Sequence, residues 1–249
     1  MTLRRNIKLT LEYDGTDFFG WQRQPNVRTV QAEVEHALSE LTQETIKTTV
    51  AGRTDTGVHA LGQVVNFKTH SDLPTDVFVK GGNAILPKDV RVIAAEEVDS
   101  NFNARFSARA RSYRYRISKK PRAIGRQYSW YLMHKVNFGL MQEACPLILG
   151  EKDFQSFCQA GTDVPHFRCV VHSATWTETE DYYIFDISAN RFLHNMVRIL
   201  VGTFLEIGSK RVRPEEIEEI LEARDRRMAG PTVPAQGLFL VRVDYHSDN

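Results

Sequence analysis

The chain has little cysteine and no long apolar run. Its 249 residues include three cysteines, Cys145, Cys158 and Cys169, and no C-x-x-C spacing. An odd number without paired spacing argues against a disulfide framework or a zinc knuckle, and predicts reduced thiols in a cytoplasmic protein. The N-terminal sequence has no signal-peptide pattern, and no stretch approaches the length of a membrane span, so we expect neither export nor membrane insertion.

Net charge is also almost absent. Lys and Arg number 32 and Asp and Glu 31, which leaves a formal charge of +1. The charges are unevenly distributed, however: residues 105–126 contain nine basic residues and no acid, whereas residues 215–225 contain six acids. A basic run of this kind is either the solvated face of a strand or a surface that contacts nucleic-acid phosphates, and nine bases without an acid favour contact with RNA.

Hydrophobic periodicity predicts an α+β chain in which the order β-α-β-β-α-β occurs twice. In the first half we expect a strand at 6–13, a helix at 28–43 with Thr29 as its N-cap, strands at 46–51 and 62–68, a helix at 75–86 and a strand at 89–98. In the second half we expect a strand at 111–118, a helix at 138–149 interrupted by its proline, strands at 170–179 and 181–190, helices at 192–208 and 214–225, and a strand at 237–246.

This order is the split βαβ arrangement of ferredoxin-like folds, present twice. It predicts two similar halves, residues 1–105 and 106–249. The sequence between them contains no low-complexity segment and no linker-like stretch. We therefore expect the halves to pack tightly.

Residues 51–63, AGRTDTGVHALGQ, are unusual for a folding segment. They contain one carboxylate, one guanidinium and three glycines, and Gly52 and Gly57 bracket Asp55 in a predicted strand connection. One interpretation is a hairpin turn in which Arg53 is a surface partner of Asp55. The other is a functional loop in which the glycines allow a positive φ or the close approach of a substrate.

Several separate segments share one resemblance, in order along nearly the whole chain. GRTDTGVHALGQVVNF together with EYDGTDFFGWQRQ, NARFSARARSYRYRI, NRFLHNMVRILVGTF and GLFLVRVDY closely resembles the tRNA pseudouridine synthase A family. The resemblance implies an isomerase that converts uridine to pseudouridine at positions 38, 39 and 40 of the tRNA anticodon stem-loop. It further implies no cofactor and no metal, a homodimer, and α+β halves that share a mostly antiparallel sheet around a cleft.

The resemblance also assigns roles to individual residues. Asp55 lies in the family's GR[ST]D motif and is implied to be the catalytic carboxylate. Arg198 matches the basic residue that pairs with this acid; it lies among apolar neighbours, which favours a buried partner over an exposed helical arginine. Arg53 is implied to help displace the target base, and a structural ion pair is the competing interpretation.

Further residues are implied to bind the substrate. Tyr113 matches the tyrosine that stacks on the target uracil, and Tyr115 is expected to pack beside it in the core. The segment that precedes the basic run matches one that touches tRNA, and comprises Phe102, Asn103, Ala104, Arg105 and Phe106. The loop at 161–165 departs from the family's basic pattern, so Arg168 is the preferred contact there. His59 is expected to be structural.

Two other functions remain open from the residues alone. A metal-dependent RNA nuclease needs a cluster of carboxylates or histidines, for which Asp14 and Asp17 are the available partners of Asp55 and His59. A non-catalytic RNA-binding protein would explain the arginines but gives Asp55 no task. A zinc base deaminase is disfavoured because neither H-x-E nor P-C-x-x-C occurs.

Overall fold

A computed structural model of the chain describes residues 4–245. The chain divides into two compact units. The first unit contains residues up to Arg109 together with the segment from Phe239 onward, and the second unit contains Ala110–Leu238. The C-terminal strand therefore belongs mainly to the first unit, whereas the sequence interpretation assigned all of 106–249 to the second half.

The first unit has the element order expected from the sequence. Its elements are β1 (Arg5–Tyr13), α1 (Val30–Thr42), β2 (Thr49–Val50), β3 (His59–Thr69), α2 (Thr75–Ile85), β4 (Val90–Val98) and most of β10 (Leu238–Asp244). The strands follow the order β4-β1-β3-β10, and β2 also pairs with β3. All these pairs are antiparallel except the short parallel pair of β3 with β10.

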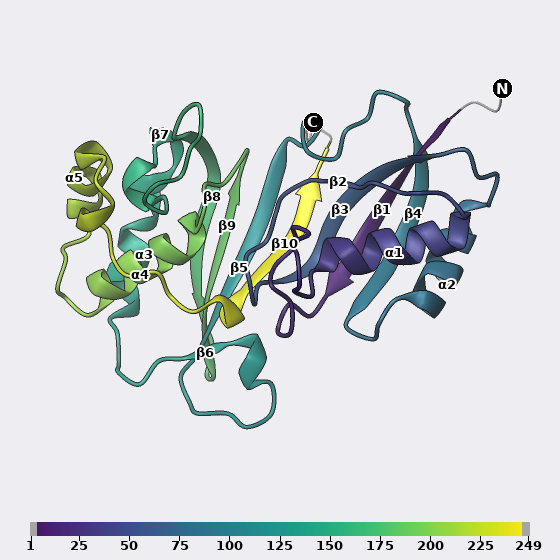
Figure 1. Cartoon of the computed structure of the whole chain (residues 1–249). Coiled ribbons are helices and arrows are strands. Elements are labelled where there is room, and N and C mark those ends of the chain that lie inside the picture. Colours follow the sequence, from purple (N-terminus) through teal and green to yellow (C-terminus); the bar gives the residue numbers. More distant parts are fainter. Residues whose placement is uncertain (1–3, 246–249) are drawn as a thin grey trace. The chain divides into compact units, whose positions relative to one another are not determined.

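Alternation along β1 explains how this sheet is covered. Ile7, Leu9 and Leu11 are completely buried on one face, as the period-2 pattern predicts. Helices α1 and α2 lie side by side in the first unit (Figure 1). Phe67 of β3 meets Phe78 of α2 edge to face, with ring centroids 5.5 Å apart, so α2 packs on the sheet through this pair.

The strands of the second unit also pair in a mostly antiparallel way. Its elements are β5 (Ala110–Ser118), β6 (Trp130–Tyr131), α3 (Phe138–Glu143), β7 (Gly150–Asp153), β8 (Arg168–Glu178), β9 (Tyr182–Ala189), α4 (Met196–Gly208) and α5 (Glu216–Ala223). The strand order is β5-β9-β8-β7, and β6 pairs in parallel with β5. Helix α4 is buried along nearly its whole length, and its Phe204 packs on Trp176 of β8 and Phe185 of β9.

Most predicted elements are confirmed, and the differences are local. The predicted helix at 138–149 ends at Glu143, and a 3₁₀ turn, Cys145–Ile148, carries the proline that was expected to interrupt it. The predicted strand at 46–51 is reduced to two residues, and β6 and β7 were not predicted because they are too short to show a period. The predicted last strand at 237–246 extends to His246, which lies outside the described residues.

Two smaller expectations have mixed outcomes. Thr29 occupies the N-cap position of α1, but its buried hydroxyl makes no hydrogen bond within residues 4–245, so it does not cap the helix through its side chain. All three cysteines are free, as predicted, and all three are buried. No helix in the described part of the chain is long and apolar enough to cross a membrane.

Candidate active site

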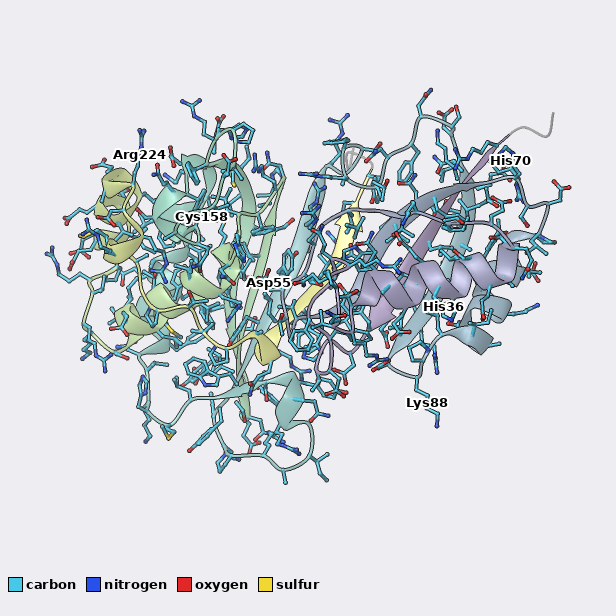
Figure 2. All side chains as sticks on the ribbon, in the orientation of Figure 1. His36, Asp55, His70, Lys88, Cys158 and Arg224 are labelled. Carbon is cyan, nitrogen blue, oxygen red and sulfur yellow. The ribbon has the colours of Figure 1, made fainter. Side chains whose placement is uncertain are left out.

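Asp55 lies in the connection from β2 to β3, in the first unit (Figure 2). Thr54 before it is buried, whereas Asp55 is partly exposed and Arg53 and Thr56 are exposed. The backbone N–H of Val58 donates to the Asp55 carbonyl oxygen at 3.1 Å, which closes a turn directly after the acid, and Gly57 in that turn has a φ of 77°. The turn interpretation is therefore right about the backbone.

The segment after β1 supports this loop through backbone hydrogen bonds. The N–H of Trp21 donates to the Thr54 carbonyl at 2.9 Å, and the N–H of Gly57 donates to the Phe18 carbonyl at 3.3 Å. Trp21 and Phe18 are each 1% exposed, so these hydrogen bonds are anchored by buried side chains. The EYDGTDFFGW motif thus serves as the support on which the Asp55 loop rests.

Two glycines make this close approach possible. Gly20 has a φ of 81°, and a Cβ placed on it would lie 2.7 Å from the Thr54 carbonyl oxygen and 3.1 Å from the Asp55 carbonyl carbon. A Cβ on Gly15 would overlap the carbonyl oxygen of Val58. No side chain fits at either position without moving the loop.

A buried polar network fixes the Thr54 side chain from the other side. The Tyr13 hydroxyl lies 2.7 Å from Thr54 Oγ1, and Gln63 Nε2 donates to that phenol oxygen at 3.3 Å and to the Gly52 carbonyl at 2.7 Å. Burial raises the pKa of Tyr13 to about 12, so the phenol stays neutral and can act as a hydrogen-bond donor. The sequence interpretation missed Tyr13 and Gln63, because neither belongs to the loop.

His59 has a structural environment, as the sequence interpretation expected. It is 1% exposed, and its ring stacks on Phe239 with centroids 4.7 Å apart. Its Nδ1 accepts from the N–H of Gly15 at 3.0 Å, and Asp14 Oδ1 lies 3.1 Å from the same nitrogen. The ring therefore ties β3 to the supporting segment.

The second unit carries the predicted base-stacking tyrosine on β5. Tyr113 is 9% exposed and meets Phe192 edge to face at 5.0 Å. Tyr115 is completely buried, and its hydroxyl donates to the Pro234 carbonyl at 2.7 Å. Tyr115 is therefore a core residue, and Tyr113 is buried apart from a small exposed fraction.

Arg198 lies in the first turn of α4 and is partly buried. Its Nε donates to the Val233 carbonyl at 2.7 Å, and its Nη1 donates to Asn195 Oδ1 at 2.8 Å. Burial raises the pKa of Tyr115, and the positive charge of Arg198 offsets part of that rise. The guanidinium is thus fixed by α4 and by the segment at 233–234, and does not extend freely into solvent as a surface arginine would.

The residues of the predicted tRNA-contacting segment divide into anchors and exposed groups. Ala104 is completely buried; its N–H donates to Asn66 Oδ1 at 2.8 Å and its carbonyl accepts from the Tyr245 hydroxyl at 2.8 Å. The Phe102 ring packs on the Tyr245 ring, with centroids 4.9 Å apart. Asn103 Oδ1 accepts hydrogen bonds from the backbone N–H groups of Arg105 and Phe106. Only the last two members present exposed side chains: Phe106 is 78% exposed, and the Arg105 guanidinium stacks on it at 5.3 Å.

The basic run at 105–126 is less available to phosphate than the sequence suggests. On β5 and the turn after it, four of its nine basic side chains pair with acids of the β8–β9 hairpin: Arg114 with Asp186 (2.7 Å), Lys119 with Glu178 (2.6 Å), Lys120 with Asp181 (3.3 Å) and Arg122 with Asp181 (2.8 Å). For this part of the run, pairing with acids distant in sequence favours the solvated strand face over the expected contact with RNA.

Arg168 begins β8 and is exposed. Its Nη1 lies 3.7 Å from Glu151 Oε1, with side-chain exposures of 70% and 60%, which is a weak surface pair. The loop before it is closed by the Thr162 hydroxyl, which donates to the Gln159 carbonyl at 2.7 Å. Among residues 4–245, no group of three or more His, Cys, Asp or Glu side chains is arranged to hold a metal ion.

Comparison with known proteins defines the class first. A family model described as tRNA pseudouridine synthase matches residues 10–107 and 144–246. The tRNA pseudouridine synthase A of Caldicellulosiruptor bescii is 45% identical over 243 residues, which are 97% of this chain and 100% of that protein. The proteins of the same name from Moorella thermoacetica (45% identity; 96% and 99% covered) and Acetivibrio thermocellus (43%; 97% and 100%) are similarly close. These are enzymes of the isomerase class.

The chain belongs to the tRNA pseudouridine synthase family. It is an isomerase, and its reaction is the conversion of uridine in tRNA to pseudouridine. This activity was predicted from the resemblance of the GRTDTG stretch and its companion motifs.

Proposed function

We propose that the chain isomerises uridines at positions 38, 39 and 40 of the tRNA anticodon stem-loop, with Asp55 as the catalytic carboxylate. The observation that carries the proposal is the construction of the Asp55 loop. Its backbone is held by Trp21 and Gln63 and its Thr54 side chain by Tyr13, while Asp55 itself is a partly exposed residue. A rigid loop that presents a single acid is what a positioned nucleophile or base requires.

The reaction needs only this kind of group. The bond between N1 and C1′ breaks, the uracil turns, and C5 joins C1′; C5 loses a proton and N1 gains one. No atom enters or leaves and no electron acceptor is required, so we propose that neither a cofactor nor a metal takes part. Asp55 supplies the carboxylate that attacks the sugar or base or takes a proton from it.

We propose Arg198 as the cation that keeps Asp55 ionised beneath the target base. Enclosure by a base removes water from the carboxylate and raises its pKa, whereas a fixed guanidinium nearby lowers it. The hydrogen bonds of Arg198 to Val233 and Asn195 support this role, because they hold the guanidinium in one place. Arg53, which is exposed beside Asp55, is proposed to help displace the base.

We further propose that Tyr113 stacks on the displaced uracil and that Arg105, Phe106 and Arg168 contact the tRNA. The exposure of the last three side chains supports this. Phe102, Asn103 and Ala104 would act indirectly, by fixing the backbone that presents Arg105 and Phe106. A displaced base stacked on an aromatic ring gains about 1–3 kcal/mol, which offsets part of the unstacking free energy.

Two proposals concern the assembly of the protein. We propose that both halves are ferredoxin-like and share a sheet around the substrate cleft. The strand order β4-β1-β3 with β2 on β3, the order β5-β9-β8, and the two stretches of similar length matched by one family model support this. By family resemblance we also propose that the protein is a cytoplasmic homodimer.

Site-resolved pseudouridine mapping tests the proposed positions. Unmodified tRNA transcripts that carry uridine at 38, 39 or 40, singly, are treated with the enzyme, and a transcript with cytidine at all three positions is the control. The proposal requires product at each single uridine and none in the control. Product that appears mainly outside the anticodon stem-loop would overturn the position assignment.

A further inference from the structure

The face of the first unit's sheet that carries Asn6 and Asn66 contains a basic hollow. Its volume is about 410 Å³, and it lies between the start of β1, the strand β2, the end of β3 and the loop at 100–103. Its basic side chains are Arg4, Lys47 and Lys68, all exposed. We name these three residues, together with Ser100, Asn101 and Asn103, the basic hollow.

The sheet register explains why the cations gather here. Lys68 pairs with Asn6 across β1 and β3, and Thr49 pairs with Asn66 across β2 and β3. Because side chains alternate along a strand, Asn66 and Lys68 point to the same face. Lys47 lies two residues before β2 begins at Thr49, and it lines the same hollow as Lys68.

The floor of the hollow is fixed by buried amides. Asn66 and Asn6 are 5% and 2% exposed; Asn66 Nδ2 donates to Asn6 Oδ1 at 2.8 Å, and Asn6 Nδ2 donates to the Asp99 carbonyl at 2.8 Å. These bonds also hold the Phe102 carbonyl, to which Asn6 Nδ2 donates at 3.0 Å. The loop that forms one wall is therefore a fixed part of the fold.

The charges in the hollow are all of one sign. None of its lining residues is an acid, and Arg4, Lys47 and Lys68 form no ion pair within residues 4–245. The nearest acid in sequence, Asp99, accepts through Oδ1 from the N–H of Asn101 at 2.8 Å and so maintains the loop. This contrasts with the basic residues on β5, whose charges are neutralised by the β8–β9 hairpin.

We propose that the basic hollow binds the phosphate backbone of the tRNA substrate. Lysine and arginine side chains contact phosphates without reading sequence, and hydroxyl and amide groups such as those of Ser100 and Asn101 contribute further donors. The lining aromatic rings are buried or packed on other side chains, so the hollow offers phosphate contacts and no stacking platform. Three separate exposed cations suit successive phosphates of a strand better than one enclosed ion.

The hollow is also continuous with a surface already proposed to contact tRNA. Asn103 lines the hollow, and its Oδ1 accepts from the N–H groups of Arg105 at 3.0 Å and Phe106 at 3.1 Å. One residue thus joins the hollow to the exposed Arg105–Phe106 pair. The inference rests on the proposed tRNA contact of that pair, and extends the contact along the first unit.

Salt-dependent binding tests the hollow. Binding of an unmodified tRNA transcript is measured over a range of NaCl concentrations for the wild type, for Lys47→Gln/Lys68→Gln, and for the control Lys88→Gln/Lys135→Gln, which removes two exposed lysines elsewhere. We expect the slope of log K against log salt to fall by about one for each lysine lost from the hollow, and affinity at ~0.1 M salt to fall roughly tenfold. We expect the control to retain the wild-type slope, the wild-type affinity and the wild-type kcat.

The outcomes separate this inference from the proposed function. A Lys47→Gln/Lys68→Gln variant with the wild-type slope and affinity overturns the hollow, even if the wild type modifies positions 38–40. If the slope falls as expected but the wild type modifies other uridines, the hollow stands and the position assignment fails. If the slope of log K against log salt falls equally in both double variants, the hollow has no special role and the inference is wrong.

Discussion

The Tyr13 hydroxyl lies 2.7 Å from Oγ1 of Thr54, the residue that immediately precedes Asp55. Tyr13 ends β1 and is 2% exposed, and Thr54 is 6% exposed. The contact therefore transmits the rigidity of a central strand to the loop that carries the proposed catalytic acid. The support of the Asp55 loop therefore includes buried residues outside the loop itself.

We predict that Gly20→Ala impairs both stability and activity. The new methyl group would lie 2.7 Å from the Thr54 carbonyl oxygen, at a residue with a φ of 81°. Overpacking costs about 1–3 kcal/mol, and the left-handed backbone adds roughly 1–2 kcal/mol. Urea unfolding and initial rates on a tRNA transcript measure the two effects.

Gly125→Ala is the matched control for that substitution. Gly125 has a φ of 73°, but a Cβ there meets nothing within 4 Å. The free energy of unfolding of Gly125→Ala should fall only by the cost of the left-handed backbone, about 1–2 kcal/mol. The variant should keep nearly full activity. Equal losses of activity in the two variants would mean that the contact between Gly20 and Thr54 does not position the loop.

Stability should fall at alkaline pH partly because of Tyr13. Its pKa is raised from 10.0 to about 12 in the folded protein, so the folded state holds a proton that the unfolded state releases above pH 10. The associated stability is intact below pH 10 and is lost as the pH rises toward 12, by about 3 kcal/mol at ~1.4 kcal/mol per pKa unit. Cys145 and Cys169, with pKa values raised from 9.0 to about 12 by burial, add a loss that begins near pH 9.

Tyr13→Phe separates the tyrosine from the cysteines. At pH 8 the variant should be less stable by about 1 kcal/mol, because a buried hydrogen bond is lost, and its loss between pH 10 and 12 should be smaller than that of the wild type. Tyr131→Phe, at a residue 38% exposed, is the control. An alkaline profile of Tyr13→Phe that matches the wild type would remove Tyr13 from this account.

The basic run should contribute unevenly to tRNA binding. Lys119 is held by Glu178 at 2.6 Å and by the Thr179 carbonyl at 2.6 Å, whereas the Arg105 side chain is exposed. Arg105→Gln should lower the salt slope of binding by about one, and Lys119→Gln should leave it unchanged. A larger fall in the salt slope for Lys119→Gln than for Arg105→Gln would show that the β8–β9 acids do not neutralise the run.

The reaction should not require a divalent metal. Product formation is measured with excess chelator, with monovalent salt high enough to keep the tRNA folded, and the folding of the tRNA is checked separately. We expect the initial rate to stay within about twofold of the untreated enzyme. Loss of activity that added metal restores, while the tRNA remains folded, would support the metal-dependent alternative.

Local patterns made much of the fold predictable. Alternating Ile7, Leu9 and Leu11 indicated β1, and the proline at 146 indicated a break within the helix predicted at 138–149. The loop that carries Asp55 was found because an acid between glycines has no role in a core. The resemblance of several motifs to one family then gave the activity.

What could not be predicted depends on register and on contacts between distant segments. Arg114 and Asp186 are 72 residues apart in sequence, and only the pairing of β5 with β9 brings them together. Gln63 and Tyr13 belong to strands whose periodicity indicates burial but not which loop they support. Sequence therefore overestimated the charge available to RNA and missed the network beneath Asp55.

The most direct test of the account is pseudouridine mapping of bulk unmodified tRNA treated with the wild type or with Asp55→Asn, with binding measured in parallel. Asn keeps the size of the side chain and removes its charge and nucleophilicity. We predict that Asp55→Asn binds tRNA with nearly wild-type affinity and forms no pseudouridine. Pseudouridine formed by Asp55→Asn at the wild-type rate would contradict the assignment of Asp55 as the catalytic group.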